Sequence, residues 1–188
     1  MKNNNRLLLS LGLIILLGTA FYGFEQYSVT HEVVPVEYER REAAKEFSLP
    51  VIGKSRYYPI EDTLNLTAAR KKPVLLHFWA SWCTVCREEK PGLDEFWAKH
   101  QDQDILVLGV ASFDTKKAMD DSKLIHDPTF TVVLDEEGAV ATVYKVPALP
   151  VSVLVGTDGY IVKKFKGALQ PYDFATIENY LESLKKAH

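Results

Sequence analysis

Val74-Leu75-Leu76-His77-Phe78-Trp79-Ala80 runs almost directly into Trp82-Cys83-Thr84-Val85-Cys86, which holds the only two cysteines of the chain. The first stretch is nearly all apolar and is bounded by polar residues, a pattern typical of a strand buried on both faces. Apolar side chains after Cys83 recur every three or four positions, which predicts a helix over Cys83–His100. Pro91 lies inside this helix and is expected to kink it. A Cys-x-x-Cys pair that a strand delivers to a helix start indicates thiol–disulfide exchange.

The bulk composition indicates one ordinary domain and excludes several classes of protein. The chain has 188 residues, 47% of them hydrophobic, and a net charge of −3. A mildly acidic chain lacks the basic surface with which proteins bind nucleic acid. Two cysteines are too few for a disulfide scaffold, and no histidine has ligand-like spacing to them. We therefore expect no bound metal and no cofactor besides a redox-active Cys83–Cys86 disulfide, with metal binding by the pair as the alternative.

The N-terminus has the pattern of a membrane-targeting segment. Leu7–Phe24 is uncharged and mostly apolar, and Lys2 and Arg6 precede it. This pattern suits an uncleaved signal anchor or a removed signal peptide, and the poor cleavage site favours the anchor. We predict a transmembrane anchor over residues 1–24, a stalk over 25–46 and a domain over 47–188. Basic residues on the N-terminal side place the domain outside the cytoplasmic membrane, on its periplasmic or other extracytoplasmic side.

The remaining pattern alternates strands and helices. A short strand or hairpin is expected from Phe47 to Tyr58, and a hairpin turn is expected at Gly156-Thr157-Asp158-Gly159. Further strands are predicted over Val74–Trp79, Ile105–Ala111, Phe130–Leu134, Val151–Val155 and Tyr160–Phe165. Further helices are predicted over Lys116–Ile125, over Val140–Tyr144 and from Pro171 onward. This order predicts an α/β fold with a mixed central sheet flanked by helices.

The two cysteines are expected to have different roles. Cys83 lies at the predicted helix start, where unpaired backbone N–H groups and the helix dipole favour a thiolate. Cys86 lies one turn deeper and can close the disulfide. We assign Cys83 as the nucleophile and Cys86 as the resolving thiol, against the alternative of two structural core cysteines.

The segment Phe78–Arg87 resembles the active site of thioredoxin-fold proteins, most of all the membrane-anchored TlpA/ResA/DsbE-like thiol-disulfide oxidoreductases. Phe130–Asp135, Tyr144–Pro150 and Leu154–Gly159 follow the order and spacing of that family. The resemblance covers about Phe47 to Leu184. It implies a thioredoxin-like fold in which Ile105–Tyr144 contains the insertion typical of this branch.

The resemblance also implies further site residues. Pro150 occupies the position of the family's cis-proline, and the backbone of Leu149 before it could pair with an incoming peptide. Glu89 matches an acidic residue near the active site that could transfer protons, and a solvated surface glutamate is the alternative. Trp82 matches the tryptophan beside the nucleophile, which provides a packing and docking surface.

Three departures from the family pattern bear on function. His77 stands where thioredoxins have a buried acid, and we expect a neutral buried histidine, with a role in proton transfer as a hypothesis. Thr84-Val85 replaces the usual proline-containing pair, and these residues tune the redox potential. Leu149-Pro150-Val151 lacks the Gly-x-Pro-Glu motif of cytochrome-maturation reductases, which weakens the case for a haem-attachment substrate.

These observations predict an extracytoplasmic reductase of disulfides in exported proteins. By analogy, a membrane electron donor of the thiol-transfer type would recharge it. The alternatives are an oxidase that donates its disulfide, a copper-handling thioredoxin-like module, and a binding module with a vestigial dithiol.

Overall fold

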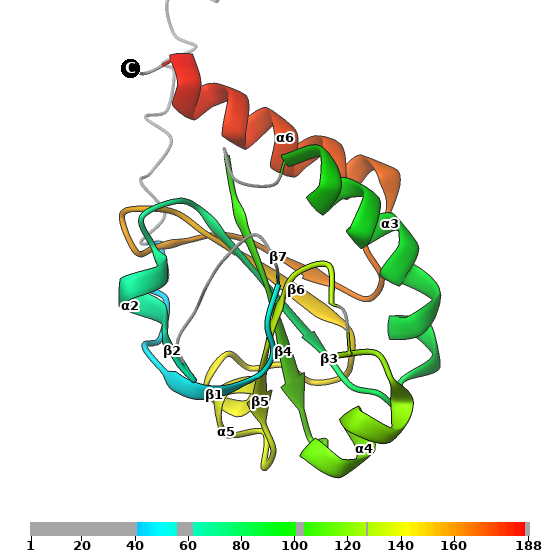
Figure 1. The fold of residues 1–188 in the computed structure, drawn as a ribbon. Helices are drawn as coiled ribbons and strands as arrows, with labels where there is room; N and C mark the ends of the chain where they lie inside the picture. Colours follow the sequence, from blue (N-terminus) through cyan, green and yellow to red (C-terminus); the bar gives the residue numbers. More distant parts are fainter. Residues whose placement is uncertain (1–40, 56–61, 101–103, 127, 187–188) are drawn as a thin grey trace, which may run out of the picture. The chain divides into compact units, whose positions relative to one another are not determined.

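One mixed sheet of seven strands forms the centre of the fold (Figure 1). The computed structural model describes residues 41–55, 62–100, 104–126 and 128–186. The strands are β1 Ser48–Gly53, β2 Thr63–Asn65, β3 Val74–Trp79, β4 Leu106–Ser112, β5 Thr131–Asp135, β6 Val151–Val155 and β7 Ile161–Lys166. The helices are α2 Leu66–Ala69, α3 Thr84–His100, α4 Lys116–Ser122, α5 Ala139–Val143 and α6 Pro171–Lys186. The prediction of a mixed α/β fold is confirmed.

The strand order is β2-β1-β5-β4-β3-β6-β7. β3, β4 and β5 are parallel neighbours, whereas β6 runs antiparallel to β3 and β7 antiparallel to β6. Every residue of β3, β4, β5 and β6 is buried, which explains their nearly continuous apolar sequences. The carboxyl ends of β3, β4 and β5 and the amino end of β6 therefore lie at one edge of the sheet.

The two longest helices cover one face of the sheet. α3 and α6 lie side by side in Figure 1, and the rings of Phe96 and Phe174 lie 5.2 Å apart between them. Lys99 and His100, in the last turn of α3, both contact the carboxylate of Glu178 in α6. The helix predicted from Pro171 onward is present, and its apolar side chains face inward, with Ile177 fully buried.

Neighbouring residues of β3 point to opposite faces of the sheet. His77 contacts Glu89 of α3, whereas the ring of Phe78 packs against Tyr144 at the end of α5, with ring centroids 5.4 Å apart. The Tyr144 hydroxyl donates a hydrogen bond to the backbone oxygen of Lys45. The segment before β1 and the end of α5 thus pack on the face opposite α3.

Most predicted elements are present, with each end at or within one residue of its predicted position. The helix predicted over Lys116–Ile125 ends at Ser122 because Lys123 adopts a left-handed conformation (φ 60°). β1 pairs with the short β2, so the predicted hairpin after Phe47 exists in part, while its expected end at Tyr58 lies outside the described residues. The four-residue helix α2 was not predicted.

The domain begins earlier than its predicted start at residue 47. The compact unit opens at Arg41, Ala43 forms a β-bridge with Tyr160, and the Ala44 N–H donates to the oxygen of Gly159. Residues 41–46, expected to end the stalk, therefore pack on the domain. The predicted anchor and the rest of the stalk lie outside the described residues. Within the described ranges, none of the helices has the length and apolar character that a membrane span requires.

Candidate active site

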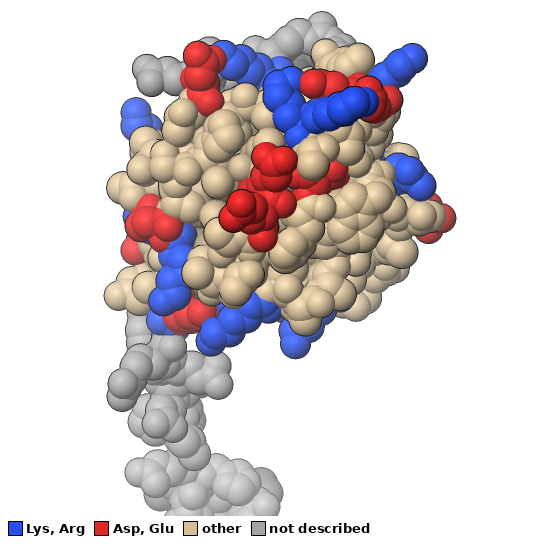
Figure 2. All heavy atoms as spheres, turned by 90° about the horizontal axis from the view of Figure 1, so that it is seen from below, with Lys and Arg blue, Asp and Glu red and all other residues tan. Residues whose placement is uncertain are grey.

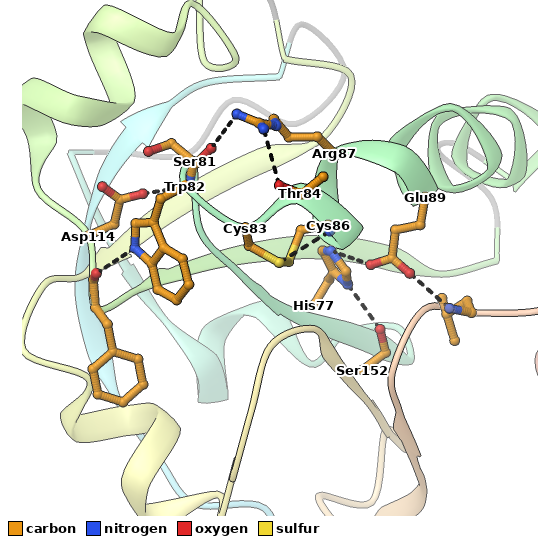
Figure 3. Close-up of a disulfide and its surroundings, with 12 residues drawn as sticks. His77, Ser81, Trp82, Cys83, Thr84, Cys86, Arg87, Glu89, Asp114 and Ser152 are labelled. Atoms are coloured by element: carbon orange, nitrogen blue, oxygen red, sulfur yellow. Dashed lines mark hydrogen bonds and ion pairs between the residues drawn. A yellow bond between two sulfur atoms is a disulfide. The ribbon is translucent and has the colours of Figure 1, made fainter.

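Cys83 and Cys86 are joined by a disulfide at the start of α3 (Figure 3). Cys83 immediately precedes Thr84, the first helical residue, and the N–H of Cys86 donates to the Cys83 sulfur at 3.2 Å. This N–H belongs to the first helical turn, whose donors have no partner within the helix. In the reduced protein it would stabilise a Cys83 thiolate. Cys83 is 7% exposed and Cys86 2%, so Cys83 is the outer of the two residues, although both are buried.

Pro150 lies at the same edge of the sheet as Cys83, because it directly precedes β6, which runs antiparallel to β3. Phe78 pairs with Val151, so the loop that ends in Pro150 lies beside the loop that leaves β3 toward Cys83. The Leu149–Pro150 bond is cis, as the resemblance implied. Among the described residues, no hydrogen bond involves the backbone N–H or C=O of Leu149. Leu149 itself is half-buried.

The side chain of Glu89 is buried, one helical turn beyond Cys86. Its side chain is 5% exposed, its Oε1 lies 3.1 Å from His77 Nε2, and its Oε2 accepts the Leu169 N–H at 2.8 Å. Burial raises the pKa of the Glu89 carboxyl from 4.5 to about 7, although the Leu169 N–H opposes this rise. The alternative of a solvated surface glutamate is wrong for Glu89, whereas Glu88 beside it is exposed.

His77 is the second buried titratable group. Its side chain is 3% exposed, and its Nδ1 lies 3.0 Å from the hydroxyl oxygen of Ser152. Burial first, and then the charge of Lys90, lower the pKa of His77 to about 3, so the ring is neutral at physiological pH. The expectation of a neutral buried histidine is confirmed, but its contact with Glu89 was not foreseen. Because a hydroxyl can donate or accept, Ser152 tolerates either tautomer of the ring.

The loop that carries Cys83 is tied to the loop that follows β4. The indole N–H of Trp82 donates to the backbone oxygen of Phe113 at 3.0 Å, and the N–H of Ser81 donates to the Asp114 carboxylate at 2.6 Å. Trp82 itself is 59% exposed, in keeping with its predicted docking role. Asp114 is buried and also accepts the N–H of Thr115. The position of the Trp82 ring is therefore set by the loop after β4, although β3 is the strand that leads to Trp82.

Sequence reasoning missed Phe113, Asp114, Ser152 and Leu169. Only Ser152 left a signal, as the single polar residue in the apolar strand Val151–Val155. The other three lie in loops that the fold brings to the site. No group of three or more His, Cys, Asp or Glu side chains suited to a metal ion occurs in the described ranges.

The model of one protein family, AhpC/TSA, matches residues 41–164. The chain belongs to this family. The thiol-disulfide oxidoreductase ResA of Bacillus thuringiensis subsp. konkukian is 29% identical over 186 residues, which cover 99% of this chain and 98% of that protein. ResA of Geobacillus thermodenitrificans is 32% identical over 121 residues, or 64% of this chain and 68% of that protein.

Solved structures have the same fold. A thiol:disulfide interchange protein, DsbE, from Chlorobium tepidum superimposes with a TM-score of 0.62 at 28% identity, over 76% of this chain and 95% of that chain. Its likeness confirms the thioredoxin-like fold. With the Cys83–Cys86 pair at a helix start, these relatives show that the chain is a ResA-like thiol-disulfide oxidoreductase.

Proposed function

We propose that this protein is an extracytoplasmic reductase that uses the Cys83/Cys86 dithiol to reduce disulfides in exported proteins. The observation that carries the proposal is the Cys83 sulfur at the start of α3, where it accepts the N–H of Cys86. A sulfur in this place is a good nucleophile and also a good leaving group, since both roles need a stable thiolate.

The reaction proceeds in two exchanges. The Cys83 thiolate attacks one sulfur of a substrate disulfide, forms a mixed disulfide and releases the second substrate sulfur as a thiolate. The Cys86 thiolate then attacks the Cys83 sulfur and releases the first substrate sulfur. Two electrons pass to the substrate, and the protein ends with the Cys83–Cys86 disulfide that the structure contains.

Glu89 is suited to accept the proton that Cys86 must lose before its attack. A carboxyl with a pKa of about 7 exchanges protons readily near neutral pH. It lies one helical turn beyond Cys86 on α3, its Oε2 accepts the Leu169 N–H, and its Oε1 lies 3.1 Å from His77 Nε2.

The substrate segment would lie between Trp82 and the loop of Leu149 and Pro150. The free backbone groups of Leu149 support pairing with an extended substrate segment in the manner of an added strand. Trp82, exposed beside Cys83, would cover the other side of that segment.

The apolar, uncharged segment Leu7–Phe24 supports a single-pass anchor in the cytoplasmic membrane, with the catalytic domain on the extracytoplasmic side. A reductase there needs a continuing supply of electrons, because its surroundings oxidise thiols. A membrane protein that transfers reducing equivalents from dithiol to disulfide is the class of donor that fits.

Trapping of substrates tests the proposal. A Cys86→Ala variant should accumulate mixed disulfides through Cys83, because the resolving thiol is missing, and Cys83→Ala is the matched control. Equal trapping by both variants would refute the assignment of the nucleophile. The redox potential tests the direction: a value near about −270 mV supports a reductase, and one near about −120 mV makes the protein an oxidase.

A further inference from the structure

Phe113 has a conformation and an exposure that the fold alone does not explain. It directly follows β4, its φ is 56°, and 46% of the residue is exposed. The left-handed region is unfavourable for a bulky residue, and glycine or asparagine would occupy it at less cost. An exposed aromatic ring on such a backbone adds little to the core. Residues held in this way occur preferentially at functional sites.

Three neighbours hold Phe113 in place. Its N–H donates to the backbone oxygen of Asp135 at 3.1 Å, and its C=O accepts the indole N–H of Trp82 at 3.0 Å. Its ring lies directly on Gly138, where a Cβ atom would come within 1.9 Å of a ring carbon. Any side chain at position 138 would therefore displace the ring.

Asp135 makes this support rigid. Its carboxylate is buried and accepts the hydroxyl of Ser112 at 2.9 Å and the N–H groups of Val140 and Ala141 at 3.0 and 2.9 Å. The end of β4, the end of β5 and the start of α5 are thus joined beneath the Phe113 ring. Phe113 is presented to solvent by a fixed backbone.

Phe113 extends an apolar surface that already borders the nucleophile. Trp82, Val85 and Phe113 are 59%, 47% and 46% exposed, and we call these three residues the docking surface. Trp82 directly precedes Cys83 and Val85 lies two residues after it, and the backbone oxygen of Phe113 accepts the indole N–H of Trp82. Figure 2 views the molecule from the end where α4 and α5 lie, and it shows a broad uncharged area beside a group of acidic side chains.

The occupant of the docking surface follows from the proposed function. A substrate sulfur must bond to Cys83, so the residues next to the substrate cysteine must lie over the surface that surrounds Cys83. Asp114, directly after Phe113, is buried and bonded to two backbone N–H groups, so its charge does not face the substrate. Glu136 and Glu137, which precede Gly138, are exposed and charged, so the apolar contact falls to the rings of Trp82 and Phe113. Aromatic and aliphatic rims of this kind bind apolar side chains.

We propose that Phe113 is a specificity-determining residue, which together with Trp82 binds an apolar side chain adjacent to the cysteine of an extended substrate segment. This inference rests on the proposed reductase function. The protein would then prefer disulfides whose cysteines are flanked by leucine, isoleucine, valine or phenylalanine. Such cysteines are exposed in unfolded or misfolded chains rather than in folded ones.

Competition between two peptide disulfides tests this inference. The probes are octapeptides that differ only in having leucine or serine on either side of the cysteine. The measured quantity is the second-order rate constant for the leucine peptide divided by that for the serine peptide. We expect Phe113→Asn to lower this ratio about five-fold, because a loss of about 1 kcal/mol of apolar contact corresponds to that factor. Asparagine also suits the left-handed backbone at this position. Phe113→Leu should restore much of that ratio. Tyr172→Ala is the matched control, because Tyr172 is 69% exposed and lies at the start of α6.

The outcomes separate this inference from the proposed function. If the unmodified protein reduces neither peptide, the reductase proposal fails. If it reduces both, and Phe113→Asn leaves the ratio unchanged, Phe113 does not determine specificity. An equal change in Tyr172→Ala would also refute the inference. Circular dichroism of each variant checks the fold, and Phe113→Gly, which relieves the backbone, replaces Phe113→Asn if that variant does not fold.

Discussion

Replacing Glu89 by glutamine should make the stability of the oxidised protein less dependent on pH. Burial raises the pKa of the Glu89 carboxyl in the folded protein from 4.5 to about 7. Between these values the unfolded chain has released the proton and the folded protein has kept it. The stabilising contribution of protonated Glu89 is therefore fully present below about pH 4.5 and is lost as the pH rises to about 7. Glutamine has nearly the same shape and cannot ionise.

The size of the effect follows from the two pKa values of Glu89. The pKa of Glu89 rises from 4.5 in the unfolded chain to about 7 in the folded protein. Since one pKa unit corresponds to about 1.4 kcal/mol, the full loss of stability is ~3 kcal/mol. Relaxation of the site and entry of water reduce this figure, so we expect a change on the order of 1–3 kcal/mol.

Urea unfolding with the disulfide intact measures this change. The unmodified protein, Glu89→Gln and Glu88→Gln would be unfolded at about pH 4.5, 6 and 8. At each pH, the free energy of unfolding of Glu89→Gln is subtracted from that of the unmodified protein. This difference should fall by about 1–3 kcal/mol between pH 4.5 and pH 8. The exposed Glu88 is the matched control, and its difference should stay within about 0.5 kcal/mol. A flat difference for Glu89→Gln would refute the raised pKa and, with it, the proposed proton transfer.

Three further predictions concern the same site. His77→Asn should lower the free energy of unfolding by about 1–3 kcal/mol, because it disturbs the buried contacts with Ser152 and Glu89; unchanged thiol titration in the reduced variant would exclude His77 from proton transfer. Gly138→Ala should destabilise the protein by about 1–3 kcal/mol, because φ is +70° and the new Cβ would overlap the Phe113 ring; an unchanged thermal midpoint would contradict the observed packing. In the reduced protein at neutral pH, iodoacetamide should modify Cys83 at least about ten-fold faster than Cys86, as followed by mass spectrometry; equal rates would contradict a stabilised Cys83 thiolate.

The elements of the fold could be predicted where the pattern is local. The apolar run Val74–Trp79 predicted β3 with its observed ends, and Val151–Val155 predicted β6 equally well, because a strand buried on both faces has few polar residues. α4 was predicted too long, because nothing in the residue Lys123 signals its left-handed conformation. The start of the domain was placed too late, because residues 41–46 are mostly charged in sequence and pack through backbone hydrogen bonds with the Gly159 region.

The sequence by itself determined that a strand ends, a helix begins and two thiols lie one turn apart, because neighbouring residues encode each of these features. The roles of Cys83 and Cys86 follow from this local arrangement. Only the tertiary structure decided the surroundings of that pair. His77 and Ser152 are 75 residues apart in the chain, and Trp82 and Phe113 are 31 apart; strand pairing brings each pair together. Whether Glu89 faces water or the interior depended on what α3 packs against. The physical reason is that burial and hydrogen bonding between distant segments set the pKa of a group, and no local pattern encodes either.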